Sequence, residues 1–122
     1  MKVYRGTREG HVADVTVDGR PLNPRLDLWN HSPSGFEWGY GGSGPAQLAL
    51  ALLADHLGDD DKAIKLHQDF KSNVVAELPY RGWTLGSEQI QRALTALAVP
   101  VLPSGGLSLN DMTIEKARKE PR

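Results

Sequence analysis

Residues 36–53 of the chain read FEWGYGGSGPAQLALALL, and this stretch decides the fold. Its first five residues alternate aromatic side chains with Glu37 and a glycine. This period of two predicts a strand over residues 36–40 with one aromatic face. Glu37 lies on the opposite face of that strand, where we expect it to pair with Arg5 or Arg25. Another element must cover the aromatic face, because aromatic side chains supply much of the burial free energy of a small domain.

The apolar residues that follow predict a helix over Gly44–Leu57. Ser43 suits the N-cap of this helix, Pro45 suits its first turn, and a glycine follows its last residue. A helix that is apolar nearly all round is a buried one. We therefore expect the central helix of the domain here, with the aromatic face of the strand packed on Leu48 and Leu52.

The N-terminal part of the chain predicts a β-hairpin. Lys2–Gly6 and His11–Asp18 carry β-branched and aromatic residues interleaved with polar ones. Asp18-Gly19 is a turn dipeptide that leads into Arg20–Leu22. This last segment is either a third short strand or an irregular run, because Pro21 cannot donate a ladder hydrogen bond. The sheet is therefore small.

Two further helices are predicted over Asp60–Leu78 and Ser87–Leu97, where apolar residues recur at helical spacing. Aspartates at 59–61 start the first of them, where capping and the helix dipole favour negative charge. The fold class is therefore α+β, with a small antiparallel sheet of three or four strands packed on about three helices. Residues 1–100 are expected to form this single domain. Residues 101–122 are expected to be a flexible or loosely attached tail, because prolines and glycines separate its charged part from the last helix.

Composition narrows the class of protein. The chain has 122 residues, a formal net charge of −1 and no cysteine. It therefore has room for one domain and cannot form disulfides, thiolate zinc sites or a thiol nucleophile. The balance of charges argues against nucleic-acid binding, which usually shows a basic excess, although it leaves room for a local basic patch. The lack of a signal sequence and of a long apolar run predicts a cytoplasmic protein that does not enter a membrane.

The stretch from Gly35 to Leu53 resembles the shared motif of a family of small bacterial and phage proteins of unknown function. The resemblance includes Tyr4-Arg5-Gly6, Phe70-Lys71 and Trp83, and so extends over residues 2–97. It implies no cofactor and no catalytic residue, because no activity is established for the family. For a protein of phage or mobile-element origin, the resemblance implies action on a host system, such as counter-defence.

The glycine-rich segment before the central helix is open to two interpretations. In the first it binds a small anion such as a phosphate, a nucleotide or a carboxylate, because free backbone N–H groups and the helix dipole favour negative charge. In the second the glycines only let the chain turn tightly, and at least one of those at 41, 42 and 44 then has a positive φ. The segment matches neither the P-loop nor the dinucleotide motif. The residues of the anion hypothesis are Gly41, Gly42, Ser43, Gly44 and Ala46.

Residues suited to catalysis or metal binding form no recognisable motif. No two histidines lie three or four residues apart, and none belongs to a His-Glu-x-x-His pattern, so no metal site is predicted. His31 lies beside Ser32 but without the Gly-x-Ser-x-Gly turn of a nucleophile, and we expect it to hydrogen-bond the loop backbone. No catalytic residue and no cofactor are therefore predicted. The four histidines are His11, His31, His56 and His67.

The remaining hypothesis is a binding function. The loop-rich segment from Arg20 to Tyr40 contains a tryptophan and several arginines, and both residue types are typical anchors of protein interfaces. The sequence therefore predicts a small non-catalytic protein-binding or regulatory protein. The alternative is a phosphate- or nucleotide-binding domain that uses the glycine-rich segment. The expected partner-binding residues are Arg20, Arg25, Trp29 and His31.

Overall fold

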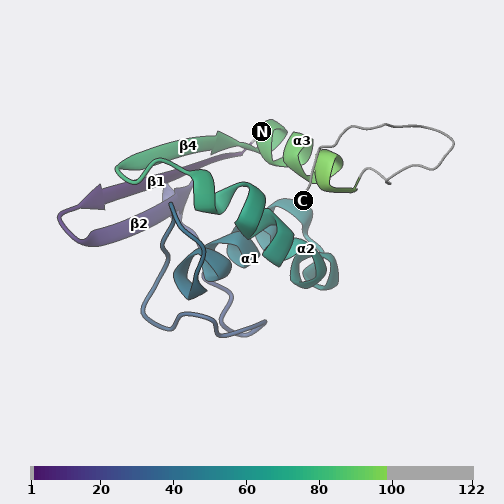
Figure 1. Ribbon diagram of the computed structural model, residues 1–122, viewed down its shortest axis with the longest axis horizontal. Coiled ribbons are helices and arrows are strands. Elements are labelled where there is room, and N and C mark those ends of the chain that lie inside the picture. The colour runs from purple at the N-terminus through teal and green to yellow at the C-terminus, as the bar shows by residue number, and fades with distance from the viewer. Residues whose placement is uncertain (1, 99–122) are drawn as a thin grey trace, which may run out of the picture.

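The computed structural model describes residues 2–98 of the chain, so the tail predicted over residues 101–122 lies outside the described residues. The described part contains an antiparallel sheet with the strand order β3-β2-β1-β4. Three helices and a short 3-10 helix complete this part (Figure 1), which confirms the predicted α+β fold. The elements are β1 (Val3–Glu9), β2 (Val12–Val17), β3 (Arg20–Pro21), α1 (Ser43–Leu57), α2 (Asp60–Asn73), η1 (Val75–Glu77), β4 (Gly82–Gly86) and α3 (Ser87–Ala98).

The sheet is built around the predicted hairpin of β1 and β2. Tyr4 lies opposite Val17 in this hairpin, and both side chains are buried on the inner face of the sheet. After β2, Asp18 and Gly19 have φ angles of 49° and 83°, the left-handed conformation that a two-residue hairpin turn requires. The turn returns the chain as β3, and Pro21 suits the edge position of this strand because an edge strand needs fewer ladder donors.

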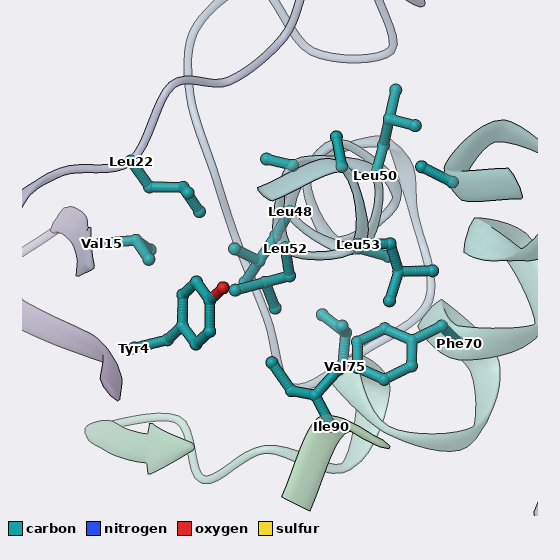
Figure 2. Packing of buried hydrophobic residues seen from close by; sticks show 14 of the residues in the cluster. Tyr4, Val15, Leu22, Leu48, Leu50, Leu52, Leu53, Phe70, Val75 and Ile90 are labelled. Atoms are coloured by element: carbon teal, nitrogen blue, oxygen red, sulfur yellow. The ribbon is translucent and has the colours of Figure 1, made fainter. Parts of the chain in front are cut away.

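Helix α1 is the centre of the hydrophobic core. All its residues from Gly44 to Ala54 are buried, as expected for a helix that is apolar nearly all round. Figure 2 shows α1 nearly end-on, with Tyr4 and Val15 of the sheet on one side, Phe70 of α2 on the opposite side, and Ile90 of α3 below and between them. The sheet and the outer helices are therefore joined by packing on both sides of one helix.

Helix α2 begins with the predicted acidic residues. Asp59 is its N-cap, and the Asp59 carboxylate accepts a 3.1 Å hydrogen bond from the backbone N–H of Lys62. The predicted helix over Asp60–Leu78 has the right start but is too long at its end, because α2 stops at Asn73. Val74 has φ and ψ of −124° and −60°, outside the helical region, and the chain continues as the 3-10 helix η1.

Residues 36–40 do not form the predicted strand. Gly35 and Gly39 have φ angles of 128° and 89°, so the backbone leaves the extended region at both ends of the segment. Trp38 is buried, whereas Tyr40, the next aromatic residue of the segment, is exposed. A backbone hydrogen bond from the Gly39 N–H to the Val75 carbonyl holds the segment in place of a strand ladder.

The strand β4 is a further difference from the sequence prediction, which carries the chain from Trp83 directly into the last helix. β4 pairs with the free edge of β1, placing Gly6 opposite Trp83 and Tyr4 opposite Leu85. It is only five residues long and has a glycine at each end. Such a short segment offers too few alternating positions for its period to be recognised.

Candidate functional site

The long connection between β3 and α1, residues 22–42, is held by one buried side chain, that of Gln47 on α1. The Gln47 Oε1 atom accepts hydrogen bonds from the backbone N–H groups of His31 (2.7 Å) and Ser32 (3.1 Å). The Gln47 Nε2 atom donates to the carbonyl of Pro24 at 2.6 Å. Because a buried amide is stable only when it is hydrogen-bonded, these three bonds attach the loop firmly to the central helix.

Arg25 holds the start of this loop against α2. Its guanidinium donates to the carboxylates of Asp27 (3.1 Å) and Asp60 (3.0 Å), the latter in the first turn of α2. Arg25 has a φ of 57°, which is uncommon outside glycine, and its backbone N–H donates to the side chain of Asn23 at 2.9 Å. The hydrogen bond from Arg25 holds the pKa of the Asp27 carboxyl below its usual range, so this ion pair is charged at neutral pH.

Two histidines that are far apart in the sequence meet at the other end of this loop. The Nε2 atoms of His31 and His67 lie 2.9 Å apart, and His67 Nδ1 lies 2.6 Å from the carbonyl oxygen of Ile64. A carbonyl oxygen only accepts, so His67 Nδ1 carries the proton, His67 Nε2 accepts and His31 Nε2 donates. The Nδ1 atom of a neutral His31 is therefore left with a free lone pair.

Trp29 stacks on this histidine pair. The Trp29 and His31 ring centroids lie 4.9 Å apart with an angle of 14° between the ring planes. The His67 ring is tilted, with its centroid 5.7 Å from that of Trp29. His67 is buried, but 49% of the surface of Trp29 is exposed. A large aromatic ring is thus presented to solvent while stacking fixes its position.

The loop contacts described above lie on one stripe of α2, which runs from Asp60 through Ile64 and His67 to Lys71. Arg25 binds the first residue of the stripe and His31 binds the third, so the loop runs along the helix in that direction. Burial lowers the pKa of His31, and the positive charge of Lys71 lowers it further, so His31 is neutral at neutral pH. The four residues of the stripe follow one another at helical spacing and are Asp60, Ile64, His67 and Lys71.

The exposed part of this region is called the Trp29 face below and consists of Leu26, Trp29, His31 and Lys71. Three of the four expected partner-binding residues lie in this region. Arg25 and His31 contact the α2 stripe directly, and Trp29 stacks on His31. Arg20 lies instead on the edge strand β3 and makes no ion pair with the residues that the structure describes. The partner-binding role of all four stays a prediction.

The start of α1 differs from the sequence prediction in two respects, its N-cap residue and the position of the glycine with a positive φ. Its N-cap is Gly42, with no side-chain hydrogen bond, so Ser43 is the first residue of the helix and not its cap. None of the glycines at 41, 42 and 44 has a positive φ, so the predicted left-handed glycine of this turn is wrong and Gly39 has that role. Gly44 is needed for close packing, because a Cβ atom there would lie 2.7 Å from the Glu37 Cβ.

Glu37 beside this helix start is bound by Arg8, and not by the expected Arg5 or Arg25. The Arg8 guanidinium donates to both carboxylate oxygens of Glu37, at 3.1 and 2.8 Å, and to the carbonyl of Tyr80 at 3.0 Å. The hydrogen bond from Arg8 lowers the pKa of Glu37. The glycine-rich segment therefore lies beside a satisfied ion pair, and its binding of an external anion stays a hypothesis.

Among residues 2–98, no group of three or more histidine, cysteine, aspartate or glutamate side chains is placed to hold a metal ion.

The pair of His31 and His67 is the arrangement that sequence reasoning misses. The two residues are 36 positions apart, and no local pattern links them. In the same described residues, no helix has both the length and the apolar character needed to cross a membrane.

Replacing Ser43 with alanine should change the free energy of unfolding by less than about 0.5 kcal/mol, because Ser43 is not the N-cap. Urea unfolding of the wild type and of Ser43→Ala measures this. Titration of both proteins with inorganic phosphate tests the anion hypothesis independently. Phosphate binding to the wild type that weakens in Ser43→Ala, without any change in stability, would assign the segment a ligand role.

A protein-family model matches residues 4–96, and its description is a family of unknown function. No curated protein and no solved structure matches the chain.

Proposed function

The chain belongs to this family of unknown function (DUF6166), and we propose that it is a non-catalytic binding protein that recognises a protein partner through the Trp29 face. The observation that supports this proposal is the combination of exposure and rigidity at Trp29. The ring is half exposed, yet it stacks on His31. Tryptophan is the residue type most enriched among the dominant contacts of protein interfaces.

The way the loop is held also supports a binding role. A loop with many polar backbone groups is usually solvated, whereas this one is attached through the buried amide of Gln47. A rigid loop loses little conformational entropy when a partner binds, so more of the contact energy is retained as affinity. Gln47 and the ion pair of Arg25 with Asp60 thus prepare the Trp29 face in its binding conformation.

The support for a class of partner is the sequence resemblance to phage and bacterial proteins. We propose a host protein in the cytoplasm as that partner, with a regulatory or counter-defence role for the complex. The same resemblance supports no catalytic residue, so binding itself would carry the effect.

Replacing Trp29 with alanine should weaken capture of the partner by about tenfold or more. The full chain and the variant are immobilised, exposed to lysate of the native cell, and compared by quantitative mass spectrometry. Tyr40→Ala is the matched control, because Tyr40 is also an aromatic residue with 52% of its surface exposed but lies outside the Trp29 face. Circular dichroism checks that each variant is folded.

A protein retained by the wild type and by Tyr40→Ala, but lost from Trp29→Ala, would support the proposal. Equal retention by all three would contradict it. Loss from Tyr40→Ala alone would instead place the binding surface at the glycine-rich segment.

A further inference from the structure

We propose that the Trp29 face binds a partner segment that carries a carboxylate beside an apolar side chain, with the carboxylate held jointly by His31 and Lys71. This inference rests on the proposed function and names the chemistry of the partner. The apolar side chain would contact the exposed ring of Trp29 and the exposed part of Leu26, which has 37% of its surface accessible. The partner's carboxylate would lie at the end of the face where the positive charge is found.

The first support is the free nitrogen of His31. Its Nε2 atom donates to His67, so only its Nδ1 atom remains for an external group. Among the described residues, Trp83 Nε1 is the one buried side-chain polar atom without a hydrogen-bond partner. His31 Nδ1 has no hydrogen-bond partner there either, and it is therefore not buried but within reach of solvent or of a ligand.

The second support is the unpaired charge of Lys71. Along the α2 stripe, Asp60 is bound by Arg25 and His67 is bound by His31. Lys71 comes next on this stripe and makes no ion pair within residues 2–98. Its side chain is only partly exposed, and a partly buried ammonium gains more from an anionic partner than a fully solvated one does.

The charges around His31 favour an anion in particular. From α2 it faces His67 and the positive charge of Lys71, and from α1 the neutral amide of Gln47 binds the backbone N–H of His31. On its own loop, the guanidinium of Arg25 is occupied by Asp27 and Asp60. A cation would be repelled by Lys71, whereas a carboxylate can accept hydrogen bonds from both the lysine and a protonated His31.

This geometry couples binding to the uptake of one proton. Burial and the nearby positive charge keep the pKa of His31 low in the free protein, and a bound carboxylate would raise it. The complex then holds more protons than the free partners in the pH range between these two pKa values. Affinity is therefore expected to rise as the pH falls through this range, by up to about tenfold per pH unit.

The experiment selects peptides on the full chain. A random dodecapeptide library is panned on the wild type, and peptides that also bind Trp29→Ala are removed. The retained peptides are expected to contain aspartate or glutamate next to an apolar residue. For a synthetic peptide of this kind, changing its carboxylate to the amide should weaken binding by about tenfold or more.

Matched variants of the protein test the two cationic groups. Lys71→Met should weaken peptide binding by a similar factor, whereas Lys65→Met, the same change at an exposed position of α2 outside the stripe, should leave it unchanged. His31→Gln should remove the rise in affinity with falling pH that is expected for the wild type, and calorimetry at a series of pH values measures this. NMR spectra of the backbone amides of each variant check that the loop keeps its structure.

The outcomes separate this inference from the proposed function. Peptides that depend on Trp29 but bind equally well as amides, or to Lys71→Met, overturn the carboxylate inference and leave a protein-binding face. Selected sequences rich in basic residues, with the same dependence on Trp29, also overturn it. If no peptide remains after those that bind Trp29→Ala are removed, the proposed function itself is contradicted.

Discussion

Replacing Gly6 with alanine should lower the free energy of unfolding by about 3 kcal/mol. Gly6 lies in the central strand β1, opposite Trp83 of β4. A Cβ atom at Gly6 would lie 2.7 Å from Cζ2 of the Trp83 indole and still closer to its Cε2 and Nε1 atoms. The indole cannot move away freely, because it packs edge-on against the buried Trp38 with ring centroids 5.6 Å apart. Urea unfolding, followed by circular dichroism, measures the loss.

Gly41→Ala is the control for this change, because its Cβ atom would meet nothing within 4 Å and its backbone needs no positive φ. It should alter stability by less than about 0.5 kcal/mol. Adding Trp83→Phe to Gly6→Ala should recover part of the loss, since the smaller ring leaves room for the methyl group. Equal stability of Gly6→Ala and the wild type would mean that β4 does not pack on β1 as described.

Replacing Gln47 with methionine should lower the free energy of unfolding by about 3 kcal/mol and release the loop that carries Trp29. Methionine has a similar length but no polar atoms. It would leave the backbone N–H groups of His31 and Ser32 and the carbonyl of Pro24 without their partner. Partner binding should fall as well, because the loop would lose its prepared conformation.

Hydrogen exchange at the amides of His31 and Ser32 reports on the loop directly, and both should exchange much faster in Gln47→Met. Gln91→Met is the control, because Gln91 is exposed on α3 and its side chain contacts His56 and not the loop, so its loss should change stability by less than about 0.5 kcal/mol. Slow exchange that persists in Gln47→Met would show that other contacts hold the loop.

The elements with long, regular patterns are the ones that the sequence predicts well. The apolar run of α1 and the acidic start of α2 predict two helices whose first residues agree with the structure to within one position. The Asp18-Gly19 dipeptide predicts the turn into β3, since few residue pairs adopt the required left-handed conformation. In these cases the information is local, so the neighbouring residues are sufficient to determine the structure.

The features that the sequence does not predict depend on distant residues. The alternating aromatic residues at 36–40 are typical of a strand, but the segment pairs with no strand of the described chain and contains Gly39, which has a positive φ. Several arginines in the sequence are candidates for pairing with Glu37. Only the position of Arg8 in β1 shows that this arginine binds it. Likewise, His31 and His67 meet because the loop runs along α2. Such contacts follow from the tertiary structure and leave no local signal.

The pairing of β1 with β4 has a consequence for the order of folding during synthesis. Val3 lies opposite Gly86, so β1 leaves the ribosome well before its partner β4, and its second edge stays unpaired until the residues between them have followed. The hairpin of β1 and β2 can form early because its contacts are local, whereas closing the sheet must wait for α1 and α2. An open strand edge is a template for pairing with other chains. The nascent chain is therefore most exposed to misassembly in the interval between completion of β2 and arrival of β4.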